Sequence, residues 1–350
     1  MTDKKKIRFI INPISGNGSK KGLPGLICRT IEKERFDCSI SYTEYGGHAA
    51  KLAKEAVEEG IDIVAAVGGD GTVNEIARSL IDTNTALAIV PYGSGNGLAR
   101  HLKIPINARK SIQLINECEI HKLDYGKING IPFFCTCGMG FDALVSRKFA
   151  STSKRGYASY MESVFNEVLK YKPETYEIED ETEKKSYKAF LITCANASQW
   201  GNNAYIAPHA SMSDGLMDVI IVEPFNAIEA LELGLQLFSK SIDRNNKIKT
   251  FKSRKIHVHR STSGAIHFDG DPTMAGEDVT VEMVSKGINV VVNPSKHPDD
   301  DREPDKTPLD IVTDFMNGIY DVRDDMRKTG RKIQMINKLL LQKIGITADD

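Results

Sequence analysis

Residues 5–125 alternate between apolar runs with strand character and amphipathic runs with helical spacing. This alternation predicts a parallel sheet with helices on both faces, because a parallel strand is reached only through a long crossover. Ligands of such sheets bind beyond the carboxyl ends of the strands. We expect strands at 6–12, 37–43, 61–67 and 86–90, and helices at 22–34, 48–59, 73–81, 96–102 and 108–116.

The loop after the third expected strand reads Gly-Gly-Asp-Gly-Thr, residues 68–72. Its glycines allow a tight turn and a close approach of the backbone to a ligand. The free N–H groups at the start of the following helix favour an anion. Because the carboxylate of Asp70 would repel a bare phosphate, it requires a cation or hydrogen-bond donors beside it. The motif indicates a nucleotide polyphosphate site with a metal ion or waters nearby; a strand-to-helix turn that binds nothing is the alternative.

Three other loops at the same expected edge have the same character. Residues 12–18 follow the first strand, 43–48 the second and 91–97 the fourth, and each contains glycine and small or polar residues. Because parallel strands bring their carboxyl ends together, we expect the four loops to form one site.

Composition excludes several classes of protein. The formal net charge of the 350 residues is −1, so no overall field attracts nucleic acid. No apolar stretch is long enough to span a membrane, and the apolar run near the basic N-terminus is too short for a signal peptide. The six cysteines have no metal-binding spacing, and we expect them to be reduced, buried thiols of a cytoplasmic protein.

Beyond residue 124 the pattern changes to short strands separated by turns, which is typical of an antiparallel sandwich or curled sheet. Two helices, 157–171 and 225–239, interrupt it with apolar residues at core-packing spacing. The expected strands are 125–128, 131–137, 187–195, 217–222, 256–258, 265–268, 279–284 and 288–292.

The chain is therefore expected to contain an α/β domain at 1–125, a sandwich domain at 126–296, a charged, proline-bearing linker at 297–308 and a helical C-terminal extension at 309–350. The extension carries two amphipathic patterns. Docking on the body, self-association into a homodimer, and contact with a membrane or a partner helix all stay open for it.

Seven motifs, in order, resemble the diacylglycerol kinase catalytic-domain superfamily, which also contains sphingosine and ceramide kinases and bacterial lipid kinases. The resemblance spans about residues 6–293 and implies an N-terminal domain akin to those of NAD kinase and phosphofructokinase. It also implies a C-terminal β-sandwich, with the active site between the two. The motifs lie at 12–16, 43–49, 68–75, 91–100, 140–145, 214–219 and 267–272.

The resemblance further implies roles for individual residues, with ATP as phosphoryl donor and Mg²⁺ as the metal. Asp214 and the carbonyls of Ser211 and Leu216 would hold Mg²⁺, which prefers oxygen ligands. Asp218 is a second candidate, with a role at the edge of the core or in a turn as the alternative. Arg100 and His101 are candidates for phosphate contacts, with surface solvation as the alternative for His101. The nucleotide contacts would be Asn12, Thr43, Gly68, Gly69, Asp70, Gly71, Thr72, Val73, Asn74, Glu75, Ser94, Gly95 and Asn96.

A lipid hydroxyl is a poor nucleophile, so a carboxylate should accept its proton. The Asp-Gly-Glu motif of the family supplies this carboxylate, but this chain reads Asp269-Gly270-Asp271, one methylene shorter. A displacement of about 1 Å costs on the order of 10²-fold where the geometry is tight. Either the site is rebuilt around the shorter arm, or Asp269 is the base and Asp271 is a metal or water partner; a plain hairpin turn is the alternative.

Two further departures concern the loops. Asn17 stands where the family often has lysine, with Lys20 and Lys21 slightly later. Residues 93–97 read Gly-Ser-Gly-Asn-Gly, a form that resembles sphingosine kinases and weakens the case for diacylglycerol as acceptor.

Three hypotheses follow. The first is an ATP- and Mg²⁺-dependent lipid kinase at the inner membrane face, acting on a diacylglycerol-like lipid or a sphingoid base. The second is a soluble NAD kinase-like enzyme, and the third is a nucleotide-binding regulator without catalysis. Peripheral membrane contact is expected at a basic cluster, for which a solvated loop is the alternative. It consists of Arg147, Lys148, Lys154 and Arg155, beside Phe149 and Tyr157.

Overall fold

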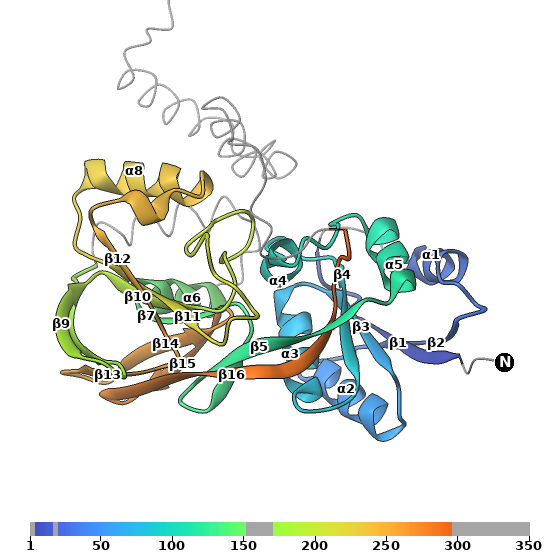
Figure 1. The fold of residues 1–350 in the computed structure, drawn as a ribbon. Helices are drawn as coiled ribbons and strands as arrows, with labels where there is room; N and C mark the ends of the chain where they lie inside the picture. The colour runs from blue at the N-terminus through green and yellow to red at the C-terminus, as the bar shows by residue number, and fades with distance from the viewer. Residues whose placement is uncertain (1–3, 17–19, 152–170, 296–350) are drawn as a thin grey trace, which may run out of the picture.

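The computed structural model describes residues 4–16, 20–151 and 171–295. Figure 1 shows an α/β part and a β-rich part side by side, joined by the long strands β5 and β16. The helices are α1 (Leu23–Thr30), α2 (His48–Glu58), α3 (Asp70–Leu80), α4 (Gly97–His101), α5 (Ala108–Glu117), α6 (Phe141–Ser151) and α8 (Ala227–Phe238), with a short helix η1 (Ile242–Arg244). The strands are β1 (Lys5–Ile11), β2 (Phe36–Tyr42), β3 (Ile63–Gly68), β4 (Ala86–Pro91), β5 (Ile120–Ile128), β6 (Ile131–Phe133), β7 (Thr136–Gly140), β8 (Glu174–Glu179), β9 (Lys184–Ala189), β10 (Leu191–Ala195), β11 (Met217–Val222), β12 (Ile248–Ser253), β13 (Lys255–Arg260), β14 (Gly264–Phe268), β15 (Asp271–Ala275) and β16 (Asp278–Val291).

The α/β part is a three-layer sandwich, as expected. Strands β2, β1, β3 and β4 are parallel neighbours in that order. Both β3 and β4 are buried along their whole length, which explains their continuous apolar sequences. Helices α2 and α3 cover one face of the sheet and share its core with Ile10 and Val64. Helices α1 and α5 cover the other face, where Ile27 and Ile112 pack against Phe9.

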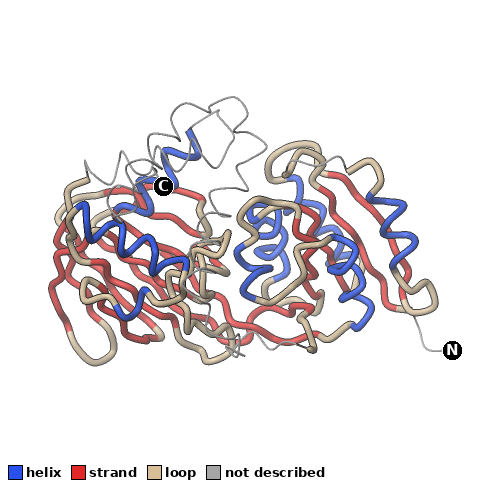
Figure 2. The backbone as a smooth tube through the Cα atoms, turned by 90° about the horizontal axis from the view of Figure 1, so that it is seen from above, coloured by secondary structure: helices blue, strands red, loops and turns tan. Residues whose placement is uncertain are grey.

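Strand β16 carries this sheet into the second part of the molecule. Its end pairs in parallel with β4, at Val290 against Leu87, while its length pairs antiparallel with β5 and β13. An irregularity between Val284 and Ile288 shifts the register against β5, and such bulges bend a strand. One continuous sheet therefore runs from β2 to β9 across both parts (Figures 1 and 2).

The expected β-sandwich is also confirmed. Its second sheet has the order β12-β11-β10-β7-β14-β15 and packs against β5, β8, β13 and β16 of the first sheet. Side chains such as Met139 and Ile192 interdigitate there with Ile178 and Val258.

Several expected elements need correction. The helix expected at 22–34 ends at Thr30, and the helix expected at 73–81 begins at Asp70. The run 187–195 is two strands that turn at Phe190, and 131–137 splits into β6 and β7, whereas 279–292 is one bulged strand. Strands β8, β12 and β15 and helix α6 were not expected. Strands β8 and β12 each contain only two buried residues among mostly polar ones, so their apolar signal is weak. The linker and extension at 297–350 and most of the helix expected at 157–171 lie outside the described residues.

Candidate functional site between the two parts

Asp70 ties two of the expected loops together. It is the first residue of α3, and its carboxylate accepts hydrogen bonds from the backbone N–H groups of Asn96 (2.8 Å) and Gly97 (2.7 Å). The sequence required either a cation or donor groups beside this carboxylate, and the structure supplies two donors. Burial raises the pKa of Asp70, while these two hydrogen bonds oppose the shift.

The glycines of the third and fourth loops allow the two loops to pack closely against each other. A Cβ at Gly93 would lie 2.6 Å from the Cα of Gly69, and one at Gly95 would lie 2.7 Å from the Asp70 carboxylate. Asn96 has a left-handed backbone, φ 50°, and its side chain bonds both the N–H and the carbonyl of Gly93. Larger residues would separate the loops.

The first loop joins the same edge. Asn12 Nδ2 donates to Thr72 Oγ1 (3.0 Å), which links the end of β1 to the first turn of α3. Lys20 folds back, and its ammonium donates to the carbonyl of Asn12 (2.6 Å) and to Ser15. Lys20 therefore supplies a cation to the loop in which Asn17, outside the described residues, stands at the lysine position of the family.

The remaining expected nucleotide residues differ in accessibility. Thr43 is buried, with its N–H bonded to Ile11, whereas Glu75 accepts a hydrogen bond from the N–H of Gly47 (3.1 Å). Val73 packs in the core, and its N–H donates to the carbonyl of Gly69. Gly71 and Ser94 lie exposed at the edge. The structure thus gathers the four loops, and which of their groups touch a nucleotide stays a prediction.

Asp269 connects the two parts of the molecule. Its carboxylate accepts four hydrogen bonds, from the backbone N–H groups of Phe134, Cys135 and Thr136 (2.7–3.1 Å) and from Asn74 Nδ2 (2.6 Å) on α3. Burial raises its pKa, and these hydrogen bonds oppose the shift. With its acceptor positions filled by protein donors, Asp269 has the surroundings of a structural carboxylate.

We expect Asp269→Asn to destabilise the protein by about 2–4 kcal/mol, because an amide would point N–H groups at backbone donors that now bond a carboxylate. Urea unfolding measures this loss. Asp271→Asn is the matched control, since Asp271 is exposed and its side chain makes no hydrogen bond among the described residues. Equal unfolding midpoints for the two variants would contradict a structural role for Asp269.

Asp271 lies at the start of β15, two residues further along the hairpin, and is exposed. Partial desolvation raises the pKa of its carboxyl, the guanidinium of Arg78 opposes this, and the carboxylate of Glu75 adds to it. Both neighbours come from α3. Asp271 pairs across the hairpin with Phe268, whose ring lies against Arg78, so this end of the hairpin lies against the helix that begins at Asp70. Arg78 was not singled out in the sequence, although it lies one turn after Asn74 on the same helical face.

A buried polar group fixes the sheet behind this hairpin. Thr193, Gly138 and His267 lie side by side on three neighbouring strands. Gly138 leaves room for the carboxylate of Asp142, which accepts from Thr193 Oγ1 (2.9 Å) and lies 3.1 Å from His267 Nε2. A Cβ at Gly138 would lie 2.2 Å from that carboxylate. The Gly140–Val145 motif therefore anchors the start of α6 to the strand that leads into Asp269.

The expected metal ligands lie at the beginning of β11. Asp214 accepts from the N–H of Leu216 (3.0 Å) and from the Lys252 ammonium (2.7 Å), which also lies 3.5 Å from Asp218. Ser211 bonds to Ser213. The oxygen donors suit Mg²⁺, but Lys252 already provides the positive charge between the two carboxylates, so the groups do not fit a divalent ion as they are arranged. Within the described ranges, no cluster of three or more His, Cys, Asp or Glu is placed to hold a metal.

Arg100 and His101, the two candidates for phosphate contacts at the end of α4, have different surroundings. Arg100 donates to the carbonyl of Gly95 (3.0 Å) and to Asn203 Oδ1 (3.1 Å), so it joins the fourth loop to the second part of the molecule. His101 is not solvated: it is buried, and its Nδ1 lies 3.1 Å from Ser198 Oγ. The apolar face of the short helix α4 carries it inward.

Asp124 was missed by the sequence reasoning. It is buried and accepts from the N–H groups of Gly215 (2.7 Å) and Lys286 (2.7 Å), which ties β5 to the start of β11 and to the bulge of β16. The sequence did contain a signal for this buried role, because Asp124 is a charged residue within the apolar strand pattern at 123–128.

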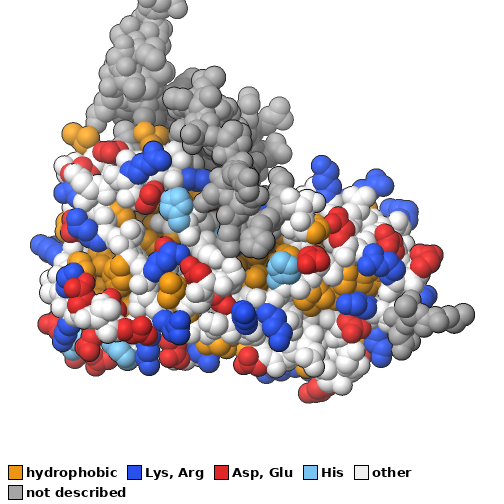
Figure 3. All heavy atoms as spheres, in the orientation of Figure 1, with side chains coloured by type: hydrophobic (Ala, Val, Ile, Leu, Met, Phe, Trp, Pro, Cys, Tyr) orange, Lys and Arg blue, Asp and Glu red, His pale blue; other side chains and the backbone are white. Residues whose placement is uncertain are grey.

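The expectation that all six cysteines are buried is wrong for two of them, and the expected basic cluster lies partly outside the described residues. Cys28 and Cys38 are exposed rather than buried, because they occupy the outward positions of α1 and of the edge strand β2. In the basic cluster, Arg147 Nη1 lies 3.8 Å from Met274 Sδ. Lys154, Arg155 and Tyr157 and the side chain of Phe149 are not among the described groups. On the face shown in Figure 3, cationic and anionic side chains are interspersed.

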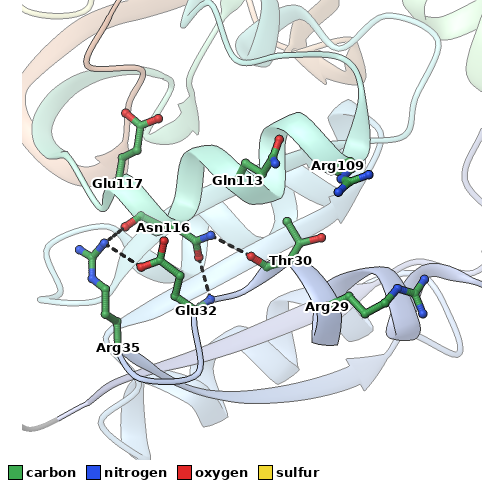
Figure 4. A pocket seen from close by; sticks show the side chains of 8 residues that line it. All are labelled: Arg29, Thr30, Glu32, Arg35, Arg109, Gln113, Asn116 and Glu117. Carbon is green, nitrogen blue, oxygen red and sulfur yellow. Dashed lines mark hydrogen bonds and ion pairs between the residues drawn. The ribbon is translucent and has the colours of Figure 1, made fainter.

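A pocket of about 440 Å³ lies elsewhere, between α1 and α5 (Figure 4). Arg35 donates to the carbonyl of Asn116, and Asn116 bonds both Thr30 and Glu32, so these groups satisfy the C-terminal ends of the two helices. The pocket contains none of the expected site residues. It is lined by Arg29, Thr30, Glu32, Arg35, Arg109, Gln113, Asn116 and Glu117.

The fold and its loops define a two-part protein in which a glycine-rich edge of an α/β sheet meets the hairpin of a β-sandwich. Residues 6–128 match the family model of the diacylglycerol kinase catalytic domain, and residues 135–292 match the YegS C-terminal NAD kinase beta sandwich-like domain. Because these matches together span most of the chain, it belongs to the diacylglycerol kinase superfamily and is a kinase.

Individual relatives agree with this assignment. The chain is 28% identical over 273 residues to a diacylglycerol kinase of Staphylococcus saprophyticus, covering 77% of this chain and 89% of the relative. It is 28% identical over 275 residues to a diacylglycerol kinase of Bacillus subtilis, covering 76% and 90%. A crystal structure of a protein described as a diacylglycerol kinase of Bacillus anthracis shares the fold, with a TM-score of 0.66 and 23% identity over 84% of this chain and 99% of that one.

Proposed function

We propose that the protein is an ATP-dependent lipid kinase that transfers the γ-phosphoryl group of ATP to a hydroxyl of a membrane lipid. The observation that carries this proposal is the contrast between the two hairpin carboxylates. Asp269 is held by four hydrogen bonds, whereas Asp271 is exposed and faces α3, the helix that starts at the glycine-rich loops. A free carboxylate beside a phosphate-type edge suits a general base.

In this mechanism the loops bind and orient ATP, and the charges in the transferred group are stabilised by positioned donors. Asp271 accepts the proton of the lipid hydroxyl as the hydroxyl oxygen attacks the γ-phosphorus. The bond from that phosphorus to the bridging oxygen breaks, and ADP leaves. A Mg²⁺ ion bound with ATP would neutralise part of the charge on its phosphates. The groups at Ser211, Asp214 and Leu216 do not fit a metal ion as they are arranged beside Lys252, and no step depends on a metal there.

We further propose that the enzyme is cytoplasmic and reaches its lipid substrate by peripheral contact with the inner face of the membrane. The basic cluster around Arg147 supports this, as does a relative from Chromohalobacter salexigens whose name describes a YegS-like lipid kinase. No helix within the described residues is long and apolar enough to cross a membrane. Formation of a homodimer and the role of the extension at 309–350 stay predictions.

The acceptor is tested with γ-labelled ATP and Mg²⁺ against diacylglycerol, sphinganine, ceramide, phosphatidylglycerol and NAD in parallel, with the lipids in mixed micelles. We expect label on a lipid. Label on NAD alone would support the NAD kinase-like alternative. ATP binding without transfer to any acceptor would support a regulator.

The pH dependence should show the raised pKa of Asp271. A base acts only when ionised, so activity falls as pH drops through that pKa. We expect the acidic limb of kcat/KM to lie above the ordinary value of 3.8 for this carboxyl, because desolvation and Glu75 raise the pKa more than Arg78 and His267 lower it. A kcat/KM profile from acidic to neutral pH measures the limb. A flat profile down to the ordinary carboxyl range would contradict this assignment.

A further inference from the structure

Arg78 has buried donors without partners. Its Nε and Nη2 atoms are buried and make no hydrogen bond within the described structure. The guanidinium carbon lies 4.5 Å from the centre of the Phe268 ring, so the aromatic face holds the plane of the group in place.

Another arginine of this chain shows how unusual this is. The guanidinium nitrogens of Arg260, a fully buried residue, donate to the carbonyls of Gly264, Ala265, Ala275 and Gly276, whereas Arg78 is half-buried with two buried nitrogens. Buried charged donors without acceptors are costly and rare, and each one calls for an explanation such as a functional role, a water or a bound ion. The unpartnered nitrogens of Arg78 therefore point to an acceptor group that binds from outside the protein.

The position of Arg78 separates it from the nucleotide loops. It lies two turns after Asp70, about 12 Å along the axis of α3. Asn74, between them on the same face, is fixed to Asp269 of the hairpin. Arg78 lies over the ring of Phe268, whose partner across the hairpin is Asp271, yet no ion pair within 4.0 Å joins Arg78 to Asp271 or Glu75 among the described residues. Arg78 therefore lies next to Asp271, the proposed base, on the side away from the nucleotide loops.

We propose that Arg78 binds an anionic phosphate oxygen of the acceptor, so that the preferred acceptor is a phospholipid whose headgroup hydroxyl lies a few bonds from its phosphodiester. This inference rests on the proposed lipid kinase function. Phosphatidylglycerol has this chemistry: its headgroup hydroxyl would approach Asp271 while its phosphodiester meets the guanidinium fork. Neutral diacylglycerol would leave the donors unpaired, and the ammonium of a sphingoid base would be repelled by Arg78.

The test compares kcat/KM for phosphatidylglycerol with kcat/KM for diacylglycerol. The diacylglycerol micelles contain phosphatidylserine, which has no free headgroup hydroxyl, so that both surfaces are anionic. Assays are run above the acidic limb, where Asp271 is ionised in all variants. We compare the wild type with Arg78→Gln, with Arg78→Lys and with Arg109→Gln, an exposed arginine of the α1–α5 pocket, as control.

We expect the wild type to favour phosphatidylglycerol, and Arg78→Gln to reduce the ratio at least tenfold. Arg78→Lys should fall between them because it keeps the charge without the fork, and it provides the test if Arg78→Gln unfolds. Arg109→Gln should match the wild type. A ratio that changes less than twofold in both Arg78 variants, or a wild-type preference for diacylglycerol or sphinganine, would overturn the role of Arg78 while leaving the lipid kinase proposal intact. Absence of transfer to every lipid would overturn both.

Discussion

Replacing Asp70 with asparagine is expected to lower kcat/KM for phosphoryl transfer by about 10²–10³-fold. The carboxylate accepts hydrogen bonds from the backbone N–H groups of Asn96 and Gly97, and it thereby holds the third and fourth loops together. An amide would direct its own N–H group toward one of these donors. The loops would then separate, and the backbone donors expected to bind the polyphosphate would lose their alignment.

The fold should survive this change, because the cores that involve Ile10 and Phe9 are made by side chains of the sheet and its covering helices. Kinetics and thermal unfolding, measured together, separate the two effects. Asp82→Asn is the matched control: Asp82 is exposed beyond the far end of α3, and its positive φ of 57° suits asparagine. Near-wild-type turnover in Asp70→Asn would show that the polyphosphate site has been misplaced.

Asp271→Asn is expected to lower kcat by about 10²–10⁴-fold, the range for loss of a general base. ATP affinity should change little, because Asp271 lies on the hairpin rather than on the loops. Stability should also stay near the wild-type value, since this side chain is exposed. Single-turnover transfer to the lipid, combined with ATP titration, measures both quantities.

This variant also decides between the two aspartates. A wild-type rate in Asp271→Asn, with a folded but inactive Asp269→Asn, would assign the base to Asp269. Asp271→Glu adds the methylene that the family has. A faster Asp271→Glu enzyme would indicate that the shorter arm weakens the site, and a slower one that the site is tuned to aspartate.

The elements that the sequence predicts well are those whose burial is simple. Strands β3 and β4 are buried on both faces, and β11 begins and ends at the expected residues because its apolar run is bounded by turns. The pairing of β16 with β4 could not be expected, because two residues far apart in sequence carry no local signal of their contact. That pairing merges the α/β sheet with one sheet of the sandwich.

The site shows the same division. Glycine-rich loops at strand ends are visible as motifs, and their meeting follows from the parallel sheet. The four hydrogen bonds to Asp269 depend on backbone N–H groups that any sequence would offer, so the motif alone left both aspartates open as base. Nothing in the sequence distinguishes Arg78 from other polar residues of an amphipathic helix; its position over Phe268 is evident only in the structure.

The most direct test of the central claim is an unbiased identification of the product. A total bacterial lipid extract is incubated with the protein, ATP and Mg²⁺, and the lipids are then compared by mass spectrometry with those of an Asp271→Asn reaction. The proposed function predicts a lipid that gains one phosphate at a hydroxyl in the wild-type reaction only. Release of ADP without any phosphorylated lipid, or the same product in both reactions, would contradict it.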